Sequence, residues 1–346
     1  MAGISINPPT TLRPTLARAL LAALLLFATA GAGLREDFRG FNIVATPGYP
    51  FGGASARRAL DGAKRLGATA VAIIPFLWQP SPSSSDIVRG TDLPDEALRT
   101  AIRQARAFGL LVIVKPHVWV PESWAGAIAP DSEEGWHAWF AGYRRAIDPI
   151  ARIAAEENAD ALAIGTELTK TAGRGEWTDV IARARAVFPG TLLYVAHNAD
   201  EAEAVSFWNL LDAIGVTLYP PLGAERDRAG RLAAMRAAAD RLDAVAARTH
   251  KPVVVAEIGL RSAQGATAMP WESAEERDAP ADGLLQAEVL ADWLTILDRP
   301  AVRGVLIWRW FTDPDAGGVA DTDFTVQGKP AEAVLRCAWT KVCGKP

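Results

Sequence analysis

The sequence predicts a closed (β/α)8 barrel of the α/β class, a TIM barrel formed by a single domain. Apolar runs of strand length alternate with stretches of helical periodicity, and eight strand candidates can be counted. Strict alternation favours parallel strands joined by crossover helices. Eight such units fit a closed barrel, and barrels of this kind often reach the 346 residues found here.

The first four units can be placed from apolar runs and from the glycines that end helices. Gly67 and Gly109 each follow a helical stretch, and a glycine is the usual residue just beyond the end of a helix. We expect strands at 40–46, 68–76, 110–117 and 161–167, and helices at 55–66, 94–108, 133–158 and 177–188.

The second half repeats this order, with a short fifth unit that passes through Phe207 and Trp208. We expect strands at 191–198, 213–219, 252–259 and 304–310, and helices at 231–249, 283–297 and 330–339. An open, doubly wound sheet is the alternative. It would normally carry a G-x-G-x-x-G phosphate loop after its first strand, and residues 48–53 (GYPFGG) do not fit that motif.

The first 30 residues have the parts of a secretory signal peptide. Arg13 and Arg18 precede an apolar run at 19–27, and the small residues at 28–30 (ATA) offer a cleavage site. The apolar run is shorter than the about 20 residues of a transmembrane helix; an uncleaved anchor is the alternative. We therefore expect an exported protein, periplasmic or secreted, whose barrel occupies residues 36–346 and has no other contact with the membrane.

The composition limits which partners and cofactors we expect this protein to bind. The formal net charge of -4 and the interspersed charges of both signs give no indication of nucleic-acid binding. The four histidines form no H-x-H or H-E-x-x-H motif, and two cysteines alone cannot complete a tetrahedral metal site. We expect no metal, no cofactor and a monomer. In an oxidising compartment Cys337 and Cys343 are expected to form a disulfide.

Two of the strand candidates end in a glutamate, Glu167 and Glu257. An ionised carboxylate loses several kcal/mol when it is buried without a partner, so a buried strand gains nothing from such an ending. Active sites of these barrels lie at the C-terminal ends of the strands. We therefore expect both acids to open into one polar site. Structural ion pairs with basic residues are the alternative.

Other side chains are expected to line the same end of the barrel. Strand side chains alternate between two faces, so an inward Glu257 implies that Val253 and Val255 point inward, and an inward Glu167 implies the same for Ala163 and Gly165. Parity also gives the expected polar and aromatic lining: Lys115, His117, Asn198, Tyr219, Trp308 and Trp310.

We expect some of the tryptophans to contact the substrate, and the remaining histidines to have only a structural role as scaffold. We expect Trp310 to contact the substrate and Trp308 to join the core. Aromatic side chains in strand-end loops often have a binding role, and four tryptophans are expected in such loops: Trp78, Trp119, Trp124 and Trp271. Three histidines are expected to be scaffold: His137, His197 and His250.

A pair of carboxylates in one site suits the hydrolysis of glycosides. One acid protonates the leaving oxygen, while the other attacks the anomeric carbon or activates water. The acid must keep its proton near neutral pH, so burial or the other carboxylate has to raise its pKa. We expect neighbouring groups to keep the nucleophile ionised or to orient sugar hydroxyls: Lys115, His117 and Tyr219.

Five short motifs together resemble a known family. They are GFNIV at 40–44, VKPH at 114–117, IGTELT at 164–169, AEIG at 256–259 and the tryptophan-bearing last strand. Their order and spacing, over about residues 38–340, resemble the clan A glycoside hydrolases, and more specifically glycoside hydrolase family 113, a family of β-mannanases.

The resemblance implies a role for each glutamate. Glu167 on strand four would be the general acid/base and Glu257 on strand seven the nucleophile of a retaining enzyme. The implied substrate is a β-linked polysaccharide or oligosaccharide, with endo-acting hydrolysis of β-mannan as the leading expectation. Most clan A families place an asparagine before the acid/base, where it binds the sugar 2-hydroxyl. This chain has the smaller Thr166 there, and we expect it to contact the sugar.

Two other functions are compatible with the barrel. A non-catalytic barrel for carbohydrate binding or envelope-polysaccharide assembly would use the same aromatic side chains without turnover. A barrel enzyme of another class would use Lys115 as a Schiff-base nucleophile. The presence of both glutamates favours the hydrolase.

Overall fold

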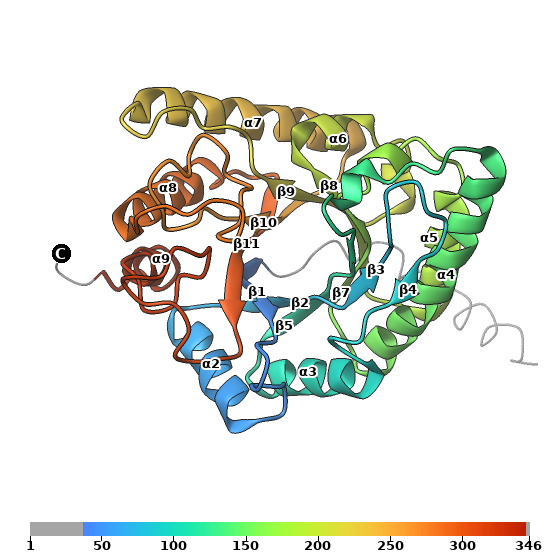
Figure 1. Ribbon diagram of the computed structural model, residues 1–346, viewed down its shortest axis with the longest axis horizontal. Coiled ribbons are helices and arrows are strands. Elements are labelled where there is room, and N and C mark those ends of the chain that lie inside the picture. The colour runs from blue at the N-terminus through green and yellow to red at the C-terminus, as the bar shows by residue number, and fades with distance from the viewer. Residues whose placement is uncertain (1–36, 344–346) are drawn as a thin grey trace, which may run out of the picture. The chain divides into compact units, whose positions relative to one another are not determined.

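The computed structural model describes residues 37–343, and in it eight parallel strands close into a barrel (Figure 1). The order around the ring is β1-β11-β10-β9-β8-β7-β5-β2, which confirms the predicted (β/α)8 fold. The strands are β1 (Phe38–Val44), β2 (Ala70–Ile73), β5 (Leu111–Val114), β7 (Ala161–Thr166), β8 (Thr191–His197), β9 (Ala213–Leu218), β10 (Val253–Ile258) and β11 (Val302–Phe311).

Helices surround this ring and cover the outer faces of the strands (Figure 1). Helix α2 is typical, because its buried residues Ala56, Ala59, Leu60 and Ala63 recur at spacings of three and four and so form one apolar face. This helix spans Ala54–Arg65. The others are α3 (Asp95–Ala107), α4 (Glu133–Glu156), α5 (Trp177–Val187), α6 (Asn198–Ala204), α7 (Arg228–Thr249), α8 (Gly283–Ile296) and α9 (Ala331–Thr340). The short α6 is the fifth unit expected from the sequence.

A small second sheet extends beyond the barrel and was not expected. Strand β3 (Phe76–Trp78) pairs in parallel with β6 (His117–Trp119) and antiparallel with β4 (Val88–Arg89). The barrel strands before it end at Ile73 and Val114, earlier than predicted. Pro75 and Pro116 follow these ends, and proline has no N–H to continue a ladder of hydrogen bonds.

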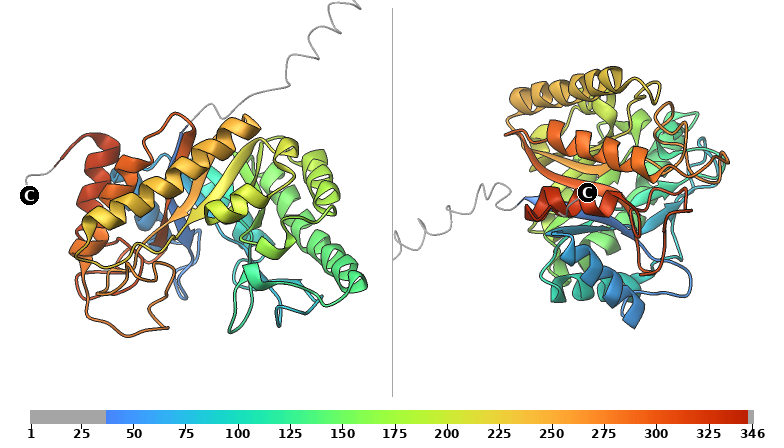
Figure 2. Two further views of the ribbon diagram at one scale, coloured as in Figure 1. Left: turned by 90° about the horizontal axis from the view of Figure 1, so that it is seen from above. Right: turned by 90° about the vertical axis from the view of Figure 1, so that its left-hand side faces the viewer.

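The loops at the C-terminal ends of the strands project from one end of the barrel (Figure 2). Those after β10 and β11 form one group. Those around the small sheet, with η1 (Ala125–Ala127), form another. Two further short helices, η2 (Thr169–Thr171) and η3 (Trp208–Leu210), belong to the loops after β7 and α6.

Trp310 belongs to the core, so the expectation that it contacts substrate is wrong. Its side chain is buried, its ring lies 4.7 Å from that of Phe41 and 5.2 Å from that of Trp339, and its Nε1 donates to the carbonyl of Ala59 at 3.0 Å. The reason is a bulge in β11. The register against β1 skips one residue between Ile307 and Trp310, and one extra residue reverses the face on which the next side chains lie.

The C-terminal cysteines, Cys337 and Cys343, form the expected disulfide. The predicted signal segment at residues 1–30 lies outside the described residues. Within residues 37–343, no helix combines the length and the apolar character needed to cross a membrane.

Trp310→Ala is expected to lower the free energy of unfolding by about 3–5 kcal/mol, as large-to-small changes of buried aromatic residues do. Trp119→Ala is the matched control, because Trp119 is 50% exposed and its removal is expected to cost less than about 1 kcal/mol. Chemical denaturation followed by fluorescence and circular dichroism measures both. Equal losses in the two variants would contradict the placement of Trp310.

Candidate active site

Glu167 and Glu257 lie in one site, and strand β9 connects them. Thr217 of β9 donates from Oγ1 to Glu167 Oε1 at 2.6 Å. Two residues later on the chain, Tyr219 donates from Oη to Glu257 Oε1 at 2.8 Å. Both carboxylates therefore face the same strand end, as expected for the C-terminal end of a parallel barrel.

A bulge precedes each glutamate. In β10 the register against β9 skips one residue between Val255 and Glu257. In β7 the register against β8 skips one residue between Ala163 and Thr166. Bulges next to active sites re-aim side chains, and here the two bulges set the direction of the two acids.

The simple parity expected for these strands is wrong across the bulges. A Cβ added to Gly165 would meet Trp177 and Tyr194. These side chains belong to the layer between strands and helices, not to the site that holds the two glutamates. Val253 and Val255 likewise join the hydrophobic core shared with the helices. The extra residue in each strand places the glutamate on the inner face although these neighbours face outward.

Glu257 is held by two donors. The Nζ of Lys115 lies 2.5 Å from Glu257 Oε2, and the Lys115 side chain is fully buried while that of Glu257 is 10% exposed. Tyr219 supplies the second hydrogen bond, to Oε1. The ring of Trp308, which was expected in the core, is half-buried with its centroid 5.5 Å from Lys115 Nζ. An ammonium group and a hydroxyl that both donate stabilise the ionised carboxylate.

Glu167 follows the end of β7 in a left-handed backbone conformation, with φ 56°. Its N–H donates to the carbonyl of Val195 at 2.8 Å, which keeps it attached to β8. Its Oε1 accepts from Thr217 and lies 3.1 Å from Nδ1 of His197. His197 is therefore part of the site, and the expectation that it is scaffold is wrong.

Asn198 determines which nitrogen of His197 carries the proton. Its Oδ1 accepts from the N–H of Tyr219 at 2.8 Å, so its amide nitrogen must be the atom that faces His197 Nε2 at 2.9 Å. Nε2 is then an acceptor, and the single proton of the neutral ring lies on Nδ1, directed at Glu167. Asn198, predicted to bind substrate, uses both ends of its amide on protein groups.

The Glu167–His197 pair shifts the pKa of each partner. Burial raises the pKa of Glu167, but the hydrogen bond and charge of His197, the charge of His117 and the hydrogen bond of Thr217 outweigh it and lower the pKa to about 2. This direction is opposite to the rise expected for the acid. Burial lowers the pKa of His197, and the carboxylate of Glu167 more than compensates and raises it. The Asn198 amide opposes this rise, because a protonated Nε2 would have no acceptor there.

His117 and Thr166 were also expected to contact the substrate, and only the side chain of His117 lacks a hydrogen-bond partner among the described residues. Burial lowers the pKa of His117, and the charge of Glu167, which acts on it in the opposite sense, does not compensate. Among residues 37–343 no side chain is hydrogen-bonded to its ring, which leaves the ring free for a ligand. Thr166 is buried and donates to the carbonyl of Pro116 at 2.9 Å, so it braces the β7 end and its predicted contact with the sugar is wrong.

The four tryptophans expected in strand-end loops are exposed, and one of them, Trp124, contacts a residue of the site. Trp78 and Trp119 lie on neighbouring strands of the small sheet with ring centroids 6.0 Å apart, and they are 40% and 50% exposed. Trp124 lies with its ring centroid 4.9 Å from that of His197, and Trp271 is exposed in the loop after β10. Such flat apolar faces can stack on a sugar ring.

The sequence did not point to Thr217, and it led us to assign two other residues of this site wrongly, His197 to the scaffold and Trp308 to the core. His197 and Thr217 stand at the ends of strands five and six, so their position near the site was readable from the strand count. Their hydrogen bonds to Glu167 were not, because these depend on the bulges that orient the strand ends.

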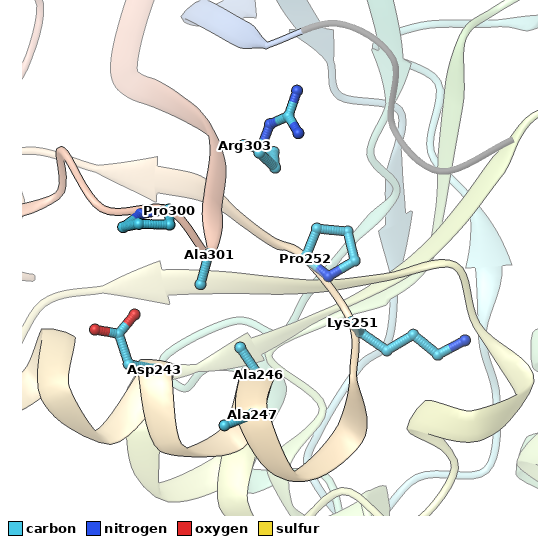
Figure 3. Close-up of a pocket in the computed structure, with 8 residues that line it drawn as sticks. All are labelled: Asp243, Ala246, Ala247, Lys251, Pro252, Pro300, Ala301 and Arg303. Carbon is cyan, nitrogen blue, oxygen red and sulfur yellow. The ribbon is translucent and has the colours of Figure 1, made fainter.

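A separate surface hollow of about 520 Å³ lies at the opposite, N-terminal end of the strands (Figure 3). Its wall consists mainly of alanines and prolines, and two of its charged residues are paired with neighbours, Asp243 with Arg299 and Arg303 with Asp37. It has no convergent pair of acids, so we place the active site at the carboxylates and not here.

A barrel with two carboxylates at the C-terminal end, bordered by exposed aromatic side chains, is the architecture of glycoside hydrolases. The family description Glycoside Hydrolase Family 113 matches residues 40–329. The chain therefore belongs to glycoside hydrolase family 113 and is a glycoside hydrolase. Among curated protein sequences, none matches it.

Solved structures agree with this family. A GH113 β-1,4-mannanase described in a complex structure is similar with a TM-score of 0.78 and 25% identity, over 89% of this chain and 100% of that one. A GH113 β-mannanase from Alicyclobacillus acidocaldarius in complex with ManMIm has a TM-score of 0.77 and 24% identity, over 91% and 99%. A β-D-glucuronidase from Dictyoglomus thermophilum shares the fold alone, at 0.59 and 15%, over 89% of this chain and 51% of that one.

Lys115→Met is expected to lower the free energy of unfolding at neutral pH by about 3–5 kcal/mol, because it leaves the carboxylate of Glu257 buried without a cation. The double variant Lys115→Met/Glu257→Gln is expected to recover most of this loss. Denaturant titrations of both single variants and the double variant give the coupling energy. Losses that simply add would show that the two groups do not depend on each other.

Proposed function

We propose that this protein is a retaining β-mannan hydrolase that cleaves internal β-1,4 bonds by double displacement. The observation that supports it most is the pair of carboxylates with unequal partners in one site: Glu257 beside a cation, and Glu167 beside an imidazole. Membership of glycoside hydrolase family 113 and the likeness to β-1,4-mannanases support the choice of substrate.

Glu257 is proposed as the nucleophile. Lys115 and Tyr219 stabilise its anion, so the carboxylate is ready to attack without losing a proton. Attack forms an ester bond between Glu257 and the anomeric carbon while the glycosidic C–O bond breaks. The electron pair of that bond goes to the leaving oxygen, which takes a proton from Glu167.

Glu167 is proposed as the general acid/base. Thr217 and His197 both engage its Oε1, so Oε2 is the oxygen that can carry the transferable proton. His197 lowers the pKa of Glu167, and the Asn198 amide offers no acceptor for a proton on His197 Nε2, so it favours the neutral imidazole. The acid role of Glu167 is therefore proposed for the state in which His197 is neutral. In the second step Glu167 takes a proton from water, the oxygen of which attacks the anomeric carbon and releases Glu257.

The exposed tryptophans are proposed to bind the glycan chain on both sides of the cleaved bond. Trp78 and Trp119 form a broad indole surface on the small sheet, and Trp124 contacts His197 beside the proposed acid. A surface of this extent favours a polymer over a single sugar. His117, free of side-chain partners in the described part of the chain, is proposed to contact sugar hydroxyls.

Export is part of the proposal. Residues 1–30 are proposed as a signal segment and residues 36–346 as the catalytic domain, acting as a monomer outside the cytoplasm. The disulfide between Cys337 and Cys343 supports this, because disulfides form and persist in oxidising compartments.

The two alternative functions have less support. A Schiff-base enzyme needs a neutral, accessible amine, whereas Lys115 is buried against a carboxylate. A barrel that only binds carbohydrate has no use for a carboxylate held by a cation and a second one beside an imidazole in the same site.

Glu257→Ala is expected to abolish the release of reducing ends from β-mannan, since no other group can form the ester. Glu167→Ala is expected to lower turnover of mannan by about 10²–10⁴-fold, the usual effect of losing an acid catalyst. It should spare the first step with a 2,4-dinitrophenyl glycoside, the leaving group of which needs no proton. Glu157→Gln, an ion-paired glutamate at the end of α4, is the control. Glucans and xylans are compared in parallel, and full activity of Glu257→Ala would refute the mechanism.

Asn198→Asp is expected to impair acid catalysis without removing a catalytic group. A carboxylate at this position would still accept from the Tyr219 N–H, but it would stabilise a proton on His197 Nε2. The imidazolium would lower the pKa of Glu167, so activity that requires protonated Glu167 would be lost at a lower pH. We expect the alkaline limb of the mannan pH profile to move down by about one pH unit or more.

Asn158→Asp is the matched control, because Asn158 also has a left-handed backbone, with φ 56°, but lies after α4 at the other end of the barrel. Its pH profile should equal that of the wild type. An Asn198→Asp profile that coincides with the wild type would contradict the assigned tautomer.

A further inference from the structure

Asn42 is a buried amide inside the barrel with no expected role in binding. It lies on β1 and is fully buried. Its Nδ2 donates to the carbonyl of Ala256 at 2.9 Å and, at a longer 3.4 Å, to the carbonyl of Ile307. These acceptors belong to β10 and β11, more than 200 positions away along the chain.

Both acceptors lie at bulges. Strand β10 carries an extra residue after Val255 relative to both of its neighbours, β9 and β11. Strand β11 carries an extra residue after Ile307 relative to β1. A bulge interrupts the ladder locally, and buried carbonyls freed in this way need another donor. The Asn42 amide supplies that donor from β1, which neighbours β11 in the ring.

These two carbonyls belong to the peptide units that carry active-site residues. The carbonyl of Ala256 is part of the peptide bond to Glu257, and that of Ile307 is part of the peptide bond to Trp308. A shift of either peptide would move the Cα of the next residue. Asn42 thus bonds the peptide unit that precedes Glu257, while Lys115 and Tyr219 bond its carboxylate oxygens.

We propose that Asn42 is a positioning residue that sets the direction of the Glu257 carboxylate by bonding the bulge carbonyls of β10 and β11. The inference rests on the proposed role of Glu257 as nucleophile. The amide acts through its donor, since Oδ1 is buried and accepts no hydrogen bond from residues 37–343. An aspartate here would set an acceptor against two carbonyls, and a leucine of similar shape would offer no donor.

Asn42→Leu is expected to lower kcat for β-mannan by about 10–100-fold, the scale of a displacement near 1 Å in an active site. KM should stay within about threefold of the wild-type value, because Asn42 does not contact substrate. The rate with a 2,4-dinitrophenyl β-mannoside should fall by the same factor, since attack by Glu257 is common to both substrates. A defect in the acid Glu167 would spare that second substrate.

Gln104→Met is the matched control. Gln104 is also a buried amide that bonds two backbone groups, the N–H of Gly52 and the carbonyl of Gly53, but it lies on α3 outside the barrel. It should lower the melting temperature without changing kcat. Asn42→Ser, with a hydroxyl too short to reach both carbonyls, is the second variant if Asn42→Leu does not fold, and the same loss of kcat is expected.

Crystal structures of the wild type and the folded Asn42 variant give a readout that needs no turnover. The proposal expects the Glu257 carboxylate to lose its contact with Lys115 or Tyr219. Retention of both contacts, or a folded variant with a kcat within about twofold of the wild type, would overturn it. A wild type that hydrolyses no glycoside would refute the proposed function instead, and the crystal structures would still decide the role of Asn42.

Discussion

A carboxylate at the end of a buried strand is stable only when protein groups replace the water that it has lost. The contact between Lys115 and Glu257 meets this requirement, and the rest of the site is arranged around it. Strand β9 adds one donor to each acid, Tyr219 to Glu257 and Thr217 to Glu167. The two acids are thereby tied to one strand, yet each has a different main partner, a cation for one and an imidazole for the other.

The direction of both acids depends on irregular strand ends. Each bulge turns a glutamate toward the site, and in each case a buried donor from another element bonds a carbonyl near the bulge. Tyr143 of α4 donates to the carbonyl of Ile164 in β7, and Asn42 of β1 donates to that of Ala256 in β10. The barrel therefore positions its reactive groups through its helix layer and through its interior as well as through its ladders.

Two prolines connect the barrel to the proposed substrate-binding surface. Pro75 and Pro116 end the ladders of β2 and β5, and the chain beyond each of them forms a strand of the small sheet. This sheet carries the exposed Trp78 and Trp119, which are proposed to bind the glycan. The motif residues Lys115 and His117 stand on either side of the second proline, so one short segment supplies the buried counter-ion of Glu257 and then the ring that is proposed to contact sugar hydroxyls.

The sequence by itself determined the barrel, the count of its strands and the place of the two glutamates, because hydrophobic periodicity and strand order are local properties that a parallel barrel preserves. It did not determine which way the strand-end side chains point. Trp310 in the core and His197 in the site both depart from simple alternation. Only the tertiary structure decided these positions, because a bulge is set by the registers of two neighbouring strands and by donors far away in the chain.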